Sequence, residues 1–264
     1  MTDTQSDRTT LHRYPARGRH DFATIGAILD EGFFCHVGFV VNGQPYVIPT
    51  GYGRVDRVLY LHGSAASRMT PAQLPRDLIT RTAVLHLSGI SLAISATALD
   101  TCMAAIDAAR QAGVAVSFDT NLRLRLWTVD RARAAMTAVL QQTDIALPSM
   151  DDMTALTGQH EPEAIVDHCL ALGAKVVALK LGDKGALVAD AHERHRIPPH
   201  PCTPVDATGA GDAFGGAFVA RRVAGDSLLA AGRYAAVAAA LSTQGYGAVE
   251  PIPRAADVRA ALRG

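Results

Sequence analysis

Several features that mark specialised classes of protein are missing from this chain of 264 residues. Its formal net charge is +0 at pH 7, so no overall field favours nucleic acid, and no basic run indicates a groove for a polyanion. No apolar run approaches the roughly 20 residues that a membrane-spanning helix needs. The polar first ten residues lack the apolar core of a signal peptide. We therefore expect a cytoplasmic protein with neither nucleic acid nor a membrane as partner.

Cysteines in metal-binding or disulfide spacing are also missing. The chain has four cysteines, far apart and without a C-x-x-C pair: Cys35, Cys102, Cys169 and Cys202. This usage predicts thiols in a reducing compartment, without disulfides or zinc. The histidines between residues 192 and 200 lie near Cys202, but their spacing fits no tetrahedral zinc pattern.

What is present is the composition of an ordinary globular protein, with 48% hydrophobic and 19% charged residues. The length allows one large domain or two small ones. The pattern changes near residue 68, so we divide the chain into residues 1–68 and 69–264.

The first part predicts a helix followed by an antiparallel meander. Asp21 is placed to cap a helix from Phe22 to Glu31, which Gly32 ends. Two β-rich runs flank Asn42-Gly43, a strong hairpin signal because a type I′ turn needs positive φ at both central residues. A third strand is expected over residues 58–62, and three strands with open edges must pack on another element or form a homodimer.

This part resembles the start of the flavin-binding split barrels related to pyridoxamine 5′-phosphate oxidase, through C-H-V-G-F-V, G-Q-P-Y-V-I-P-T and L-Y-L-H-G-S-A-A-S-R. The resemblance implies FMN contacts at Thr50, Ser67 and Arg68. It stops after about 70 residues, before the strands that close such a barrel. We therefore expect no working FMN site.

From Thr70 onward strands and helices alternate, which predicts a parallel sheet with crossover helices. The expected strands cover residues 84–88, 114–118, 144–148, 175–180 and 186–190. The expected helices cover residues 98–112, 130–142, 150–156, 161–172, 211–224, 228–243 and 255–262. The fold class is α/β, a Rossmann-like three-layer sandwich.

The central stretch of the chain is V-D-A-T-G-A-G-D-A-F-G-G-A-F, residues 205–218. Gly209, Ala210 and Gly211 lie where a loop becomes a helix, and free amides there favour an anion. Asp212 falls in the first turn, where a carboxylate can accept a proton from a hydroxyl group. A capping carboxylate beside glycines that allow close packing is the other interpretation, and local physics does not decide between the two.

D-A-T-G-A-G-D resembles the signature of the ribokinase/PfkB carbohydrate kinases, above all those acting on 2-keto-3-deoxygluconate. The resemblance covers residues 64–264 and implies ATP and Mg²⁺ as cofactors and a sugar acid as acceptor. It makes Asp212 the catalytic base and residues 209–211 an anion hole. It places Asp206 and Thr208 of the signature with the nucleotide.

Three further motifs extend the resemblance. F-D-T-N-L-R follows a strand and implies substrate contacts by Asp119, Asn121 and Arg123, although a surface turn would look the same.

K-L-G-D-K-G resembles a loop that lies against the nucleotide, through Lys180, Gly182 and Gly185, although a glycine-rich hairpin would look the same. Asp152 replaces the family's metal-organising Glu, and its shorter reach favours a contact through water. Ala236 stands where related kinases carry Asn near the adenine.

The sequence thus predicts an ATP-dependent carbohydrate kinase. The family's first hundred or so residues, which supply a lid and sugar contacts, are replaced here by the split-barrel segment, and this predicts impaired turnover. Two alternatives remain open: an FMN-binding oxidase-like protein, and an inactive recombinant of two truncated domains.

Overall fold

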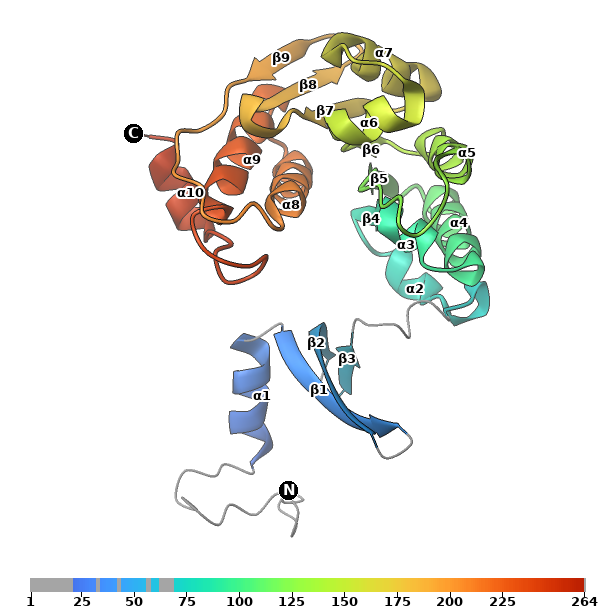
Figure 1. Ribbon diagram of the computed structural model, residues 1–264, viewed down its shortest axis with the longest axis vertical. Coiled ribbons are helices and arrows are strands. Elements are labelled where there is room, and N and C mark those ends of the chain that lie inside the picture. Colours follow the sequence, from blue (N-terminus) through green and yellow to red (C-terminus); the bar gives the residue numbers. More distant parts are fainter. Residues whose placement is uncertain (1–20, 32–33, 42–43, 56–57, 62–68, 264) are drawn as a thin grey trace. The chain divides into compact units, whose positions relative to one another are not determined.

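The computed structural model describes residues 21–31, 34–41, 44–55, 58–61 and 69–263. It divides into two compact units, residues 1–68 and residues 69–264, which are treated separately (Figure 1). None of the helices within the described ranges combines the length and apolarity needed to cross a membrane.

Within the described residues, the first unit contains one helix and three strands. They are α1 (Phe22–Glu31), β1 (Phe34–Val41), β2 (Gln44–Val55) and β3 (Val58–Leu61). The Asp21 carboxylate accepts a hydrogen bond from the Thr24 amide at 2.8 Å, which confirms the predicted cap. The strands form an antiparallel meander in the order β1-β2-β3. The turn residues Asn42 and Gly43, and the FMN positions Ser67 and Arg68, lie outside the described residues.

The second unit is an α/β sandwich. Its strands are β4 (Val84–Ser88), β5 (Ala115–Asp119), β6 (Ile145–Ala146), β7 (Val176–Lys180), β8 (Ala186–Asp190) and β9 (Arg194–Ile197). Its longer helices are α4 (Ala96–Gln111), α5 (Val129–Leu140), α6 (Met150–Thr157), α7 (Pro162–Leu172), α8 (Ala210–Val223), α9 (Leu228–Ser242) and α10 (Ala255–Ala261). Short elements are η3 (Pro71–Gln73), α2 (Arg76–Ile79), α3 (Gly89–Ala93) and η4 (Gly182–Lys184).

The six strands lie in sequence order from β4 to β9. Neighbouring strands from β4 to β7 are parallel, and β8 and β9 are antiparallel to their neighbours. Strand β9 was not predicted, because R-H-R-I carries little apolar pattern and three of its four residues are at least partly exposed.

Two apolar cores lie on opposite faces of this sheet. On one face Val116, Phe118 and Leu179 pack with residues of α4, α5 and α7. On the other face Leu147 and Val188 pack with α8 and α9. Figure 1 shows α8 and α9 on one side of the sheet and the helices α4 to α7 on the other. The predicted three layers are therefore present, and the loops that follow β4, β5 and β7 come together beside the start of α8.

Candidate active site

The start of α8 has the geometry of an anion site. Gly209 is the N-cap residue with φ 79°, and no side chain caps this end. Of the predicted anion-hole residues 209–211, Ala210 already donates its amide to the Ala207 carbonyl oxygen at 3.1 Å. Because the first amides of a helix have no intrahelical acceptor, those of Gly211 and Asp212 remain available to a ligand. Both residues are exposed. A Cβ atom on Gly209 would lie 2.9 Å from that of Ala248, so glycine is required here by packing as well as by φ.

The loop before α8 is held in shape by Asp206. Its Oδ1 accepts hydrogen bonds from the Thr208 hydroxyl at 2.6 Å and the Thr208 amide at 2.9 Å. Its Oδ2 accepts one from the Gly247 amide at 2.9 Å. These bonds, above all the one from the Thr208 hydroxyl, hold the pKa of Asp206 below its usual range. Asp206 and Thr208 therefore shape the loop, and their contact with a nucleotide stays a prediction.

A buried ion pair lies beneath the same helix end. The Lys180 Nζ lies 2.5 Å from the Asp119 Oδ2, and the two side chains are 14% and 5% exposed. The same Nζ lies 3.7 Å from the point that a Cβ atom on Gly211 would occupy. Burial raises the pKa of Asp119 and the Asp212 charge adds to this, while Lys180 opposes it. The structure thus brings Asp119, Lys180, Gly211 and Asp212 together.

The loop after β5 is fixed in an unusual backbone conformation. Asn121 has φ 33°, which is rare for a residue other than glycine. Its amide donates to the Asp119 Oδ1 at 3.2 Å, and its Nδ2 donates to the Ser88 Oγ at 2.9 Å. Gly89 lets the end of β4 lie close to the loop after β5, since a Cβ atom there would lie 1.9 Å from the Thr120 carbonyl oxygen. Such a conformation persists only where its surroundings hold it, which is common at functional sites.

Asp152, the expected metal residue, holds the other side of this loop. Its Oδ2 accepts hydrogen bonds from the Thr120 hydroxyl at 2.8 Å and the Leu122 amide at 3.2 Å. Within the described ranges no three His, Cys, Asp or Glu side chains form a group that could hold a metal ion. A role toward Mg²⁺ therefore needs the phosphates of a nucleotide as further ligands, which is how Mg²⁺ usually binds.

Replacing Asp152 by Ala is expected to lower the free energy of unfolding by about 1–3 kcal/mol, because two donors lose their acceptor. Denaturant titration measures this change. Asp151→Ala, one residue away and exposed, is the matched control and should stay within about 0.5 kcal/mol of wild type. Equal stability of the two variants would show that the hydrogen bonds from Thr120 and Leu122 to Asp152 do not stabilise the fold.

The glycines of the 180–185 loop differ in their surroundings. Gly182 has φ 63°, and a Cβ atom there would meet nothing within 4 Å, so its backbone is open to a ligand. A Cβ atom on Gly185 would lie 2.1 Å from the Ile197 carbonyl oxygen. The need for glycine at this second position therefore comes from the approach of β9, and its nucleotide contact stays a prediction.

Arg123 is exposed, and its Nη1 donates to the Leu122 carbonyl oxygen at 2.9 Å. The structure does not bring its guanidinium to the Asp119–Lys180 pair by any hydrogen bond among the described residues. Its contact with a substrate acid stays a prediction.

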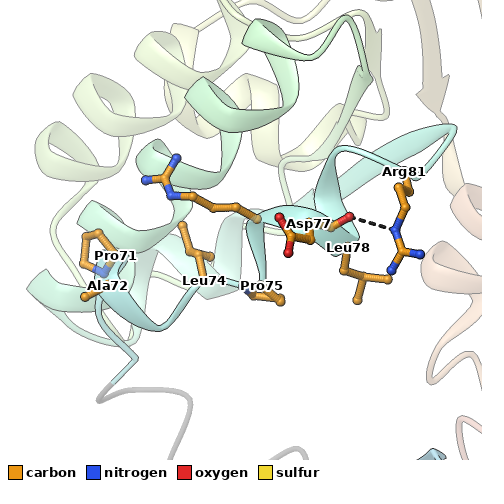
Figure 2. Close-up of a pocket in the computed structure, with 8 residues that line it drawn as sticks. Pro71, Ala72, Leu74, Pro75, Asp77, Leu78 and Arg81 are labelled. Carbon is orange, nitrogen blue, oxygen red and sulfur yellow. Dashed lines mark hydrogen bonds between the residues drawn. The ribbon is translucent and has the colours of Figure 1, made fainter.

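A separate surface hollow of about 640 Å³ lies over η3 and α2 (Figure 2). Within it the Arg81 Nε donates to the Asp77 carbonyl oxygen at 3.0 Å. None of the predicted site residues lines this hollow. Its lining residues are Pro71, Ala72, Leu74, Pro75, Arg76, Asp77, Leu78 and Arg81.

Sequence reasoning missed His86, Ser88 and Gly89, at the end of β4. No motif marks them, since V-L-H-L-S reads only as a strand. Their places beside β5 follow from the strand register, which pairs His86 with Ser117 and Ser88 with Asp119.

Residues 46–255 match the family model described as pfkB family carbohydrate kinase. Fructokinase-1 of Oryza sativa subsp. japonica is 32% identical over 242 residues, which cover 88% of this chain and 72% of that protein. The 2-dehydro-3-deoxygluconokinase of Bacillus subtilis is 33% identical over 199 residues, which cover 74% of this chain and 60% of that protein.

Among solved structures, a ribokinase-II-type protein of E. coli in complex with ATP and Mg²⁺ has a TM-score of 0.71 and 27% identity. The likeness covers 86% of this chain and 70% of that chain. The family match begins within β2, ahead of the boundary between the two units.

Proposed function

The chain belongs to the pfkB family of carbohydrate kinases, which are ATP-dependent sugar kinases, and we propose that it transfers the γ-phosphoryl group of ATP to a hydroxyl group of a sugar acid. The first acceptor to test is 2-keto-3-deoxygluconate. A matching relative named 2-dehydro-3-deoxygluconokinase supports this acceptor. A relative named fructokinase makes fructose the second.

The observation that carries the proposal is the uncapped start of α8 with Asp212 in its first turn. The amides of Gly211 and Asp212 would hold the negative charge that develops on the transferred group. The Asp212 carboxylate would accept the proton of the attacking hydroxyl. Mg²⁺ bound with ATP would supply positive charge that offsets part of the phosphate charge.

The remaining predicted residues would position the two substrates. Lys180 lies close enough to Gly211 to add positive charge beneath the anion site, and the open backbone at Gly182 would lie against the nucleotide. Asp119 and Asn121 hold the loop after β5, from which Arg123 would reach the acceptor acid. Asp152 would contact Mg²⁺ through water while keeping its loop bonds.

A coupled assay of ADP release tests the proposal, with MgATP and either 2-keto-3-deoxygluconate or fructose. We expect release that depends on one of these acceptors. A thermal-shift measurement with MgATP accompanies it, because a ligand bound only by the native state raises the melting temperature. A shift without acceptor-dependent release would indicate an inactive nucleotide-binding protein. Neither a shift nor release would overturn the proposal.

The flavin alternative finds no support in the family match, which extends over most of the chain. We therefore expect the absorption spectrum of FMN to be the same with and without the protein, and the melting temperature of the protein to be the same with and without FMN.

A further inference from the structure

One half of the α8-side face of the sheet is polar. Leu85 and Leu87 of β4 pack into the core formed with α4 and α5. Because side chains alternate along a strand, His86 and Ser88 lie on the opposite face, toward the side of α8. The register pairs them with Ser117 and Asp119 of β5. These four residues carry polar groups where the neighbouring strands carry the apolar residues of the second core.

The His86 ring is held from one side only. Its Nδ1 lies 2.8 Å from the Ser117 Oγ, and Ser117 is fully buried. His86 as a residue is exposed, although its contact with Ser117 is partly buried. Its other ring nitrogen, Nε2, has no hydrogen-bond partner among the described residues. A histidine fixed at one nitrogen and open at the other is oriented to bind a ligand.

The charged groups of the proposed active site act on this imidazole. Partial burial lowers the pKa of His86 below its usual value. The negative charges of Asp119 and Asp212 raise it, and the positive charge of Lys180 lowers it. These groups come from β5, α8 and β7, so His86 shares the electrostatic environment of the catalytic candidate from a different strand. With its pKa lowered, the ring is neutral at pH 7 and suits a hydroxyl group better than a carboxylate.

We propose that His86 binds the acceptor, with its Nε2 forming a hydrogen bond to a sugar hydroxyl other than the one phosphorylated. This inference rests on the proposed kinase function and assigns the α8-side face of β4 and β5 to the polyol end of the acceptor. Ser117 is then a positioning residue, which fixes the ring through its Nδ1.

Two substitutions separate the roles of the two nitrogens. In His86→Asn the side-chain amide can reach the Nδ1 position, so the Ser117 contact is kept and the Nε2 contact is lost. In His86→Gln the amide can reach the Nε2 position instead. We expect His86→Asn to raise the acceptor KM about 5- to 10-fold, the effect of one hydrogen bond, with the KM for ATP unchanged. His86→Gln should keep the acceptor KM within about 2-fold of wild type. Because it loses the contact with Ser117, its melting temperature should lie below that of His86→Asn.

The matched control is His160→Asn, at an exposed position after α6, which should change neither KM nor melting temperature. The inference is overturned if both His86 variants keep the wild-type acceptor KM, whatever their melting temperatures. It is equally overturned if His86→Gln loses acceptor binding and His86→Asn keeps it.

Calorimetric titration of the full chain with the acceptor alone, in the presence of a non-hydrolysable ATP analogue, supplies a readout that needs no turnover. A wild-type chain that neither binds an acceptor nor releases ADP would remove the proposed function, and this inference with it. A wild-type chain that works while His86→Asn binds acceptor equally well would remove this inference alone.

Discussion

Asp212→Asn should lower kcat by about 10²- to 10⁴-fold, which is the usual contribution of a general base. The substitution keeps the size and the hydrogen-bonding reach of the side chain but removes its ability to accept a proton at neutral pH. The amides at the start of α8 are unchanged, because they belong to the backbone. MgATP should therefore still raise the melting temperature, while ADP release nearly stops.

The assay compares wild type, Asp212→Asn and the control Asp100→Asn, which changes an exposed carboxylate on α4 in the same way. The control should keep the wild-type rate. Equal rates for wild type and Asp212→Asn would remove the catalytic assignment. Loss of both rate and MgATP binding would assign Asp212 to the nucleotide instead of the proton.

The second large effect is expected from the ion pair beneath α8. Lys180→Met should lower the free energy of unfolding by about 3–5 kcal/mol, because it leaves the Asp119 carboxylate buried without its partner. The double variant Asp119→Leu/Lys180→Met should recover most of this loss, since no buried charge remains. Denaturant titration of wild type, both single variants and the double variant measures the coupling between the two residues.

The loss in Lys180→Met should depend on pH in a defined direction. Burial already raises the pKa of Asp119, and removal of Lys180 takes away a group that opposes this. The native state of the variant then binds a proton more readily than the unfolded state does. Its stability therefore falls as pH rises through the folded-state pKa and recovers as pH falls, so the gap to wild type narrows in acid.

Lys175→Met is the matched control for this pair. Lys175 lies 2.8 Å from Asp144, but its side chain is 78% exposed, so loss of the pair should cost less than about 1 kcal/mol. Similar losses in Lys180→Met and Lys175→Met would show that burial of the first pair has no energetic consequence.

The sequence alone determined the layered α/β architecture and most helix boundaries. These depend on local patterns: apolar periodicity, Ser or Asp at helix starts, and Gly at helix ends. Helix α1 occupies the predicted residues, and α6 ends where Gly158 adopts φ 75°. The sequence also located the family signature, because its seven residues are contiguous. Residue roles within that signature stay predictions until the variants are measured.

Only the tertiary structure decided which side chains meet. Asp119 and Lys180 were assigned to different ligands, yet they bind each other across 61 residues of chain. Asp152 accepts a hydrogen bond from Thr120, which lies 32 residues before it. His86 contacts Ser117 because the register of β4 and β5 pairs the two residues. The requirement for Gly89 likewise comes from the Thr120 carbonyl of another segment. Local sequence patterns carry no information on such partners, because strand order and register set these contacts and both emerge only when the sheet assembles.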